Sequence, residues 1–494
     1  MNLNWLIIVP LLNALALLPA RGLKQVRSIA LAGSLAQLVL SSILLYLFWQ
    51  QRTAGNGGAM LFESRYAWYE AWNIYIQTGV DGISISMILL TALVVVAGVL
   101  VSWKVETLSK EFFFLLILLS VGAFGFFIST DLFSMFFYLE LAVIPKYLLI
   151  GIWGSGKKEY SANKLALMLM GGSALVLVGL AGIYYNTGTF SLTGIARIGM
   201  STEAQRLFFP FAFIGFGIFT ALFPFHTWVP DGHSSAPTAG SMFLAGISMK
   251  LGGYGCLRVA AFLMPEAAHY YSPVIITLAA IAILYGSFAT MMQTDLKYIN
   301  AYSSVSHCGF VLLGIGMVTK TAIAGAVVQM VSHGLMTALF FATIGMVYER
   351  THTRVVARMG GLLKVTPFIS TIFVIVGLCS LGLPGFSGFV AEMMVFMGSW
   401  QNADGYYRLI TIIATASIVV TAVYILRATG KVIMGPLNTG DATGIIDARW
   451  NERAAAFLLM AGIVIIGVAP YFITNLVNPG VEQIMQQISP VAVK

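Results

Sequence analysis

The run Phe112-Phe-Phe-Leu-Leu-Ile-Leu-Leu-Ser-Val-Gly-Ala-Phe-Gly-Phe-Phe-Ile128 carries no charged residue and does not alternate between apolar and polar positions. The run from Val274 to Ala289 has the same character. A strand of a membrane β-barrel would alternate with a period of two residues, whereas a helix that crosses a bilayer needs roughly 20 mostly apolar residues in succession. The sequence therefore predicts helices that span a membrane.

The composition extends this prediction to the whole chain. Of its 494 residues, 59% are hydrophobic and 9% are charged, whereas a soluble protein carries about 25% charged residues. The apolar residues suffice for about fourteen crossings of a bilayer. We therefore exclude a soluble enzyme. The net charge of +8 does not indicate nucleic-acid binding, because the basic residues lie in short connections between apolar runs.

The three cysteines, Cys256, Cys308 and Cys379, lie far apart inside apolar segments. This spacing excludes a disulfide framework and a zinc site. The first apolar run could be a signal peptide, but no basic residue precedes it, and Arg21 and Lys24 follow it. We therefore expect an uncleaved first span that starts on the outer side.

Lys and Arg residues gather in alternate connections between the apolar segments. Because cytoplasmic connections are enriched in basic residues, we expect an integral membrane protein with both termini on the outer side, in a bacterial inner membrane. The segments that we predict to span the membrane are residues 3–20, 27–49, 82–103, 112–130, 132–153, 161–186, 207–226, 237–262, 272–292, 298–319, 321–348, 365–400, 406–434 and 454–475.

Glycine and proline interrupt two of these segments, around Pro224 and Pro237 and around Pro384. The neighbouring spans then form two sets of five, each with a broken helix at its fourth position. Two equivalent sets of an odd number of helices must lie upside down relative to each other, as in many transporters. The predicted fold class is therefore an all-α membrane protein of about 14 transmembrane helices with two inverted five-helix repeats. Its expected parts are three N-terminal helices and an outer connection (1–110), the first repeat (111–262), the second repeat (272–434) and a C-terminal helix (435–494).

Six titratable residues remain inside the predicted spans once the loop charges are set aside. They are Glu140, Lys146, Lys250, His307, His333 and Glu392. A charge at mid-membrane costs about 3 kcal/mol or more, so a functional role is the first hypothesis for such residues. We expect them to form one buried polar row near half height.

Each of these residues also has a structural alternative. Glu140 could pair with a neighbouring chain, and Lys250 could balance a buried carboxylate. His307 and His333 could be hydrogen-bonded histidines without a relay role. The chemistry that suits the row is proton transfer, because burial disfavours a charged lysine and a nearby carboxylate favours it.

The sequence contains no nucleophile with a plausible histidine partner, no phosphate-binding glycine loop and no haem-ligating pair of histidines. We therefore expect this chain to hold no cofactor, to move ions and to leave redox chemistry to partners.

One long motif reads Phe223-Pro-Phe-His-Thr-Trp-Val-Pro-Asp-Gly-His233, and Leu244-Ala-Gly-Ile-Ser-Met-Lys250 follows it. Others are Ala301-Tyr-Ser-Ser-Val-Ser-His307, Gln329-Met-Val-Ser-His-Gly334 and Leu383-Pro-Gly-Phe-Ser-Gly-Phe-Val-Ala-Glu392. As a set, these motifs resemble the antiporter-like membrane subunits of respiratory complex I, and among them subunit M, the counterpart of mitochondrial subunit 4. The resemblance runs from about residue 80 to 435.

The resemblance implies fourteen helices with inverted five-helix repeats. It also implies that Glu140, Lys250 and Glu392 lie on a proton path, with His307 and His333 as the polar bridge between the two halves.

One position departs from the family pattern. The lysine expected on the seventh helix falls at Phe219, which cannot carry a proton. On the fifth helix, Lys146 follows Pro145 at a position that is usually uncharged in the family. We predict that the Lys146 ammonium reaches the space beside Phe219 and pairs with Glu140, directly or through water. The alternative is that Lys146 extends to the inner surface or meets a neighbouring subunit.

The function that we predict is that of a proton-translocating subunit of a NADH:quinone oxidoreductase. The expected partners are the other membrane subunits of complex I, including neighbouring antiporter-like subunits, together with protons and lipid. A subunit of a multi-subunit cation/proton antiporter or of a membrane-bound hydrogenase is the alternative. A non-translocating scaffold is a third, because the seventh-helix lysine is missing.

Overall fold

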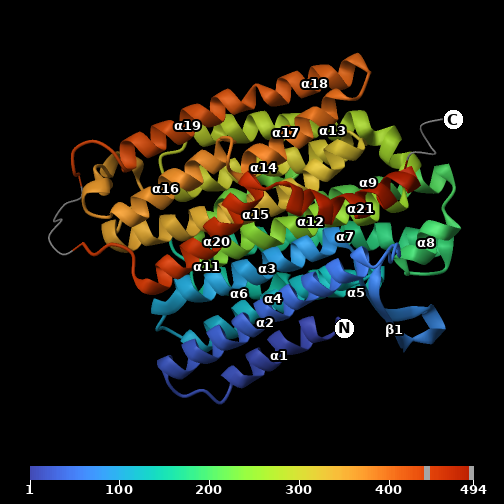
Figure 1. The fold of residues 1–494 in the computed structure, drawn as a ribbon, viewed down its shortest axis with the longest axis horizontal. Helices are drawn as coiled ribbons and strands as arrows, with labels where there is room; N and C mark the ends of the chain where they lie inside the picture. Colours follow the sequence, from blue (N-terminus) through green and yellow to red (C-terminus); the bar gives the residue numbers. More distant parts are fainter. Residues whose placement is uncertain (439–444, 489–494) are drawn as a thin grey trace.

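The computed structural model describes residues 1–438 and 445–488 of the chain. Its helices lie side by side, and most of them run along the longest dimension of the molecule (Figure 1). Within the described residues, 10 helical segments are long and apolar enough to cross a membrane. The predicted class, a helical membrane protein, is confirmed.

The first part of the chain contains the following helices: α1 (Trp5–Leu17), α2 (Leu23–Thr53), α3 (Gly82–Val101), α4 (Ser109–Ile128), α5 (Leu132–Leu141), α6 (Val143–Trp153), α7 (Lys158–Thr187), α8 (Leu192–Ile198), α9 (Thr202–Thr220), α10 (Trp228–Ser235), α11 (Thr238–Phe243) and α12 (Met249–Gly255). The second part contains α13 (Pro265–Met291), α14 (Leu296–Gly316), α15 (Lys320–Thr351), α16 (Pro367–Ser380), α17 (Ser387–Trp400), α18 (Gly405–Thr415), α19 (Ser417–Val432), α20 (Trp450–Val468) and α21 (Tyr471–Ile488).

A two-stranded antiparallel sheet departs from the all-helical prediction. Strand β1 (Leu61–Tyr69) pairs with β2 (Ile74–Val80) in the connection between α2 and α3. The hairpin is tied to the start of α5, because the Thr130 amide donates a hydrogen bond to the Gln77 carbonyl at 2.9 Å. Most of β1 is exposed on both faces. It therefore lacks the alternation of buried and exposed positions that identifies a strand in a sequence.

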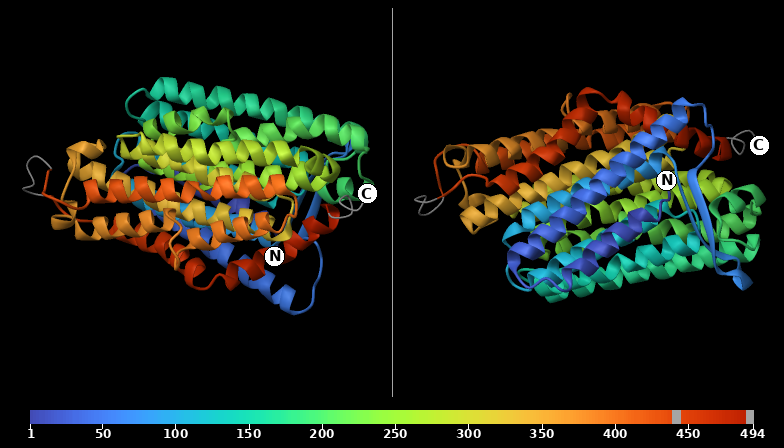
Figure 2. Two further views of the ribbon diagram at one scale, coloured as in Figure 1. Left: turned by 90° about the horizontal axis from the view of Figure 1, so that it is seen from above. Right: turned by 60° about the horizontal axis from the view of Figure 1, so that its bottom comes forward.

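After α20 the chain forms a separate amphipathic helix, α21, where we predicted that the last span continues to residue 475. The α20 helix ends at Val468 and α21 begins at Tyr471. One face of α21 is buried, and Glu482 on the other forms an ion pair with Lys320 at 2.6 Å. Figures 1 and 2 place α21 and the hairpin at the same end of the molecule, named here the hairpin end. The last predicted segment, 435–494, extends partly outside the described residues.

Both predicted interruptions in long helices are present. The α9 helix ends at Thr220 and α10 begins at Trp228. The α16 helix ends at Ser380 and α17 begins at Ser387. In the first break, the Trp228 indole donates a hydrogen bond to the Ile218 carbonyl at 2.9 Å and so satisfies one carbonyl at the end of α9.

The interior of the molecule is built around α15. This helix packs against α3, α11, α14, α16, α17, α20 and α21. Its most apolar stretch is entirely buried, so a polar side chain on any face of α15 has protein rather than lipid around it. This position explains how His333 can lie within hydrogen-bonding reach of two neighbouring helices.

Candidate functional site

Lys250 lies in the first turn of α12 and is 1% exposed. Its ammonium lies 2.7 Å from His333 Nδ1 on α15. It also donates to the Ala245 carbonyl at 2.5 Å. Ala245 belongs to a π-helical stretch, Leu244–Ser248, directly before α12, and such widened turns are frequent at functional sites. Lys250 is therefore held by two hydrogen bonds in a buried environment.

His307, a second buried histidine, lies next to His333 and extends the row away from Lys250. The rings of His333 and His307 are 5.4 Å apart between centroids. His307 Nδ1 lies 3.4 Å from Glu392 Oε1 on α17, and His307 Nε2 lies 3.1 Å from the Ser380 hydroxyl. The predicted row is thus present for Lys250, His333, His307 and Glu392, on four different helices.

The two ring nitrogens of His307 give it a choice of partners. Gln329 Nε2 lies 3.5 Å from the same Nδ1 that faces Glu392. His307 Nδ1 can accept from this amide when it carries no proton, or donate to the Glu392 carboxylate when it does. A change of tautomer or of protonation at His307 therefore changes which neighbour it contacts, as a proton relay requires.

The α16–α17 break positions Glu392. Gly382 and Gly385 adopt positive φ angles of 74° and 97° in this break, a region that glycine enters without a steric penalty. A Cβ atom at Gly382 would lie 2.7 Å from Glu392 Oε2. The bare Cα of Gly382 therefore makes room for the carboxylate.

Glu140 and Lys146 do not join this row. Glu140 is half-buried on α5, and Lys146 is 1% exposed on α6. Lys146 Nζ and Glu140 Oε1 are both buried without a hydrogen-bond partner among the described residues. A direct pair between them, which we predicted as one of two arrangements, is therefore not formed. The burial of Lys146 also shows that its ammonium does not extend to the surface of the chain.

Phe219 is the aromatic neighbour of Lys146. The ammonium lies 5.8 Å from the centre of the Phe219 ring, so Lys146 approaches the space beside Phe219 as predicted. A cation over a ring at this distance gains about 0.5–2 kcal/mol, which is less than the roughly 3 kcal/mol or more that a buried charge costs at mid-membrane.

Sequence reasoning missed two buried polar residues near the row. His233 on α10 is completely buried, stacks on Phe341 and has no hydrogen-bond partner for either ring nitrogen among the described residues. Lys297, which we assigned to a connection, is 6% exposed, and its ammonium donates to the Ala236 carbonyl at 2.6 Å. Both residues lie close to predicted helix ends, where position alone does not distinguish a buried side chain from one that reaches water.

Two ion pairs join segments that are far apart in the sequence. Arg258 is 2% exposed and forms a buried ion pair with Asp81. Asp231 forms an ion pair with Lys164 at 2.7 Å and accepts a hydrogen bond from the Tyr298 hydroxyl. In both cases the partner lies on a distant segment that one sequence does not reveal.

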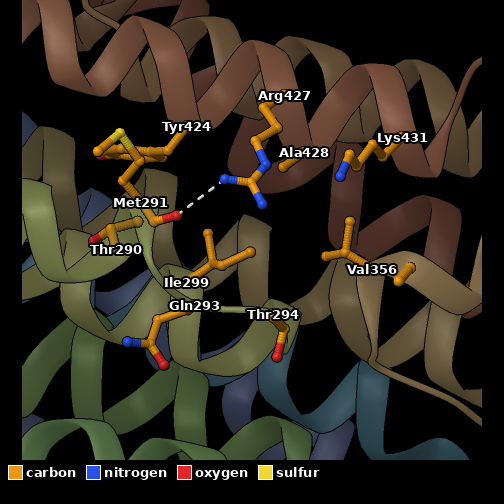
Figure 3. A pocket seen from close by; sticks show the side chains of 11 residues that line it. Thr290, Met291, Gln293, Thr294, Ile299, Val356, Tyr424, Arg427, Ala428 and Lys431 are labelled. Atoms are coloured by element: carbon orange, nitrogen blue, oxygen red, sulfur yellow. Dashed lines mark hydrogen bonds between the residues drawn. The ribbon is translucent and has the colours of Figure 1, made fainter.

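Pockets whose lining includes charged side chains lie at the end of the molecule opposite the hairpin. A pocket of about 600 Å³ is lined by residues that include Lys157, Tyr160, Asp231 and Arg354. A smaller one, of about 50 Å³, lies between α19 and the connection from α13 to α14, where Arg427 donates to the Met291 carbonyl at 3.3 Å (Figure 3). The residues of these pockets do not include the six predicted site residues.

Broken helices around buried, hydrogen-bonded titratable groups define an ion-transporting class of membrane protein. Residues 129–421 match the family model described as "NADH:quinone oxidoreductase/Mrp antiporter, TM". A relative from Microcystis aeruginosa, named NAD(P)H-quinone oxidoreductase chain 4 2, is 37% identical over 92% of this chain and 84% of its own length. The chain belongs to this family of membrane subunits.

Solved structures agree with this assignment. A chain of respiratory complex I from Thermus thermophilus superposes with a TM-score of 0.89 and 25% identity, over 98% of this chain and 99% of that chain. A chain of the Mrp complex from Dietzia has a TM-score of 0.86 at 18% identity, over 99% of this chain and 98% of that one. The second similarity concerns the fold alone.

Proposed function

We propose that this chain is a proton-translocating membrane subunit of a NAD(P)H:quinone oxidoreductase. The observation that carries the proposal is the buried chain of contacts from Lys250 through His333 and His307 to Glu392. All four residues are titratable, and neighbouring members are within hydrogen-bonding reach or have rings in contact. The names of the relatives support the choice of enzyme complex.

In the proposed mechanism, Lys250 holds the proton and the histidines pass it on. The Lys250 ammonium gives a proton to His333 Nδ1, and the neutral amine that remains is favoured by burial. His333 then passes a proton to His307 through a bridging water molecule, because no direct hydrogen bond joins the two rings. His307 Nδ1 passes its proton to the Glu392 carboxylate, and release of that proton from Glu392 completes the transfer. A change of charge near Lys250 would load or empty the row, so the row can respond to redox chemistry elsewhere in the complex.

The architecture that we propose for this function has fourteen spans in two inverted repeats, 111–262 and 272–434. The positions of the α9–α10 and α16–α17 breaks support it. The basic connections support an orientation with both termini on the outer side, in a bacterial inner membrane.

The proposed partners are the other membrane subunits of the complex, among them neighbouring antiporter-like subunits, together with lipid. Glu140 is half-buried on α5, with Phe137 exposed on the same helix and Ile144 exposed at the start of α6, which suits a surface that a neighbouring subunit covers. We propose that the chain holds no cofactor and that other subunits carry out the redox chemistry.

Purification of the complex through a tag on this chain tests the assignment. We expect the co-purifying proteins to include peripheral iron-sulfur and flavin subunits as well as membrane subunits. Recovery of a cation/proton antiporter or a hydrogenase assembly in their place would contradict the proposal.

A further inference from the structure

The helical hydrogen bonding of the fifth predicted span is interrupted near its middle. The α5 helix ends at Leu141 and α6 begins at Val143, while Ala142 between them keeps helical backbone angles (φ −77°, ψ −16°). This break has a local cause, because Pro145 has no amide hydrogen to donate to the Leu141 carbonyl and its ring strains a continuous helix. Glu140 and Lys146 therefore stand on opposite sides of the break.

Lys146 and Glu140 have opposite charges, and each has a buried polar atom that lacks a hydrogen-bond partner among the described residues. These atoms are Lys146 Nζ and Glu140 Oε1. A buried ammonium without an acceptor is unfavourable, and a water molecule between the two groups would satisfy both. The neighbour that the structure gives Lys146, the Phe219 ring, cannot accept or donate a proton.

The end of α9 connects Lys146 to the helix of Lys250. Phe219 lies in the last turn of α9, beside the break that follows Thr220. On the same turns, Phe216 and Thr220 pack so closely on Gly252 of α12 that a Cβ atom there would overlap them. One helix end thus separates the Lys146 ammonium from α12, which carries Lys250. The end of α9 therefore packs against α12 at Gly252, two residues after Lys250, and contacts Lys146 through Phe219.

We propose that Lys146 is the proton-holding cation of the first half of this subunit and takes over the role of a lysine at Phe219. It exchanges protons through water across the α5–α6 break with Glu140. When Lys146 gives up a proton it becomes a neutral amine, and the proton passes to the Glu140 carboxylate, which becomes a neutral acid. This inference rests on the proposed function.

The test moves the cation rather than only removing it. Complexes containing Lys146→Met, Phe219→Lys or both are purified, reconstituted into proteoliposomes, and assayed for quinone reduction and for protons pumped per electron pair. We expect Lys146→Met to lose most of the coupled pumping and the double variant to regain it. Lys24→Met, the same substitution at an exposed lysine outside the site, is the matched control and should pump as the wild type does.

Lys250→Ala in the same assay separates a failure of the proposed function from a failure of the role proposed for Lys146. If Lys250→Ala pumps normally in an assembled complex, the proposed function fails, whatever Lys146 does. If Lys250→Ala is inactive but assembled Lys146→Met pumps normally, only the role of Lys146 is contradicted. If the complex with Lys146→Met does not assemble, the double variant distinguishes a structural role of Lys146 from a proton-holding one. A lysine at position 219, on another helix, could not restore a purely structural role of Lys146. A double variant that assembles without pumping would overturn the proposal.

Discussion

Glu392 depends on a glycine that makes no hydrogen bond to it. Gly382→Ala would place a methyl group 2.7 Å from Glu392 Oε2 at a φ of 74°. A residue with a Cβ in this backbone region costs about 1–2 kcal/mol, and the Glu392 carboxylate, whose Oε1 faces His307, must also shift to make room for the methyl group. We expect Gly382→Ala to lower both the thermal stability of the complex and its proton pumping, as measured in purified complex and in proteoliposomes.

Gly430 provides the control for this substitution. It lies exposed on α19, and a Cβ atom there would meet no neighbour within 4 Å. Gly430→Ala should leave pumping unchanged and preserve or slightly raise stability, since alanine favours a helix by up to about 1 kcal/mol over glycine. Equal effects of the two substitutions would show that the Gly382 position does not shape the site.

Most of the charged site residues could be predicted from the sequence because of their chemistry. Lys250, Glu392, Glu140 and Lys146 could be chosen from the sequence because a charge in an apolar span is costly and therefore rare. His233 gave no such signal, because it falls in the connection between the predicted spans 207–226 and 237–262. The contact between Lys146 and Phe219 could be proposed because the lysine that the resemblance implies at position 219 is missing, whereas an extra lysine occurs at position 146.

At the scale of elements, the Arg258–Asp81 pair joins α3 to the π-helical stretch Cys256–Ala261 at the hairpin end. Removing one partner of a buried pair leaves an uncompensated charge and costs roughly 3–5 kcal/mol. Arg258→Ala should therefore strongly destabilise the purified complex in thermal unfolding.

Lys320→Ala is the matched comparison. Its ion pair with Glu482 is half-exposed, and exposed pairs contribute about 0–1 kcal/mol. We expect the wild type and Lys320→Ala complexes to have similar melting temperatures and the Arg258→Ala complex to melt at a clearly lower temperature. An Arg258→Ala complex as stable as Lys320→Ala would contradict a structural role for the buried pair.

The elements differ in how well the sequence predicted them. Spanning helices were visible because each needs a long apolar run, and the two breaks because proline and glycine interrupt such runs. The hairpin was missed because β1 exposes both of its faces, and α21 because an amphipathic surface helix has no run of spanning length. The break between α5 and α6 was only partly foreseen from Pro145.

At the scale of the whole molecule, the proposed orientation can be tested by cysteine labelling. Gly57 lies exposed in the hairpin connection and Lys157 lies exposed at the opposite end. The native cysteines are buried, so they give little background. With a membrane-impermeant thiol reagent on intact cells, we expect Gly57→Cys to be labelled and Lys157→Cys to be protected until the membrane is opened. The reverse pattern would contradict the placement of the termini on the outer side.

The central claim is that Lys250 holds the proton that this subunit moves. The most direct measurement is the number of protons pumped per electron pair by complexes containing Lys250→Ala in proteoliposomes, with assembly verified by subunit composition. We expect a loss of most or all coupled pumping in a complex that is still assembled. Near-normal pumping in that complex would contradict it.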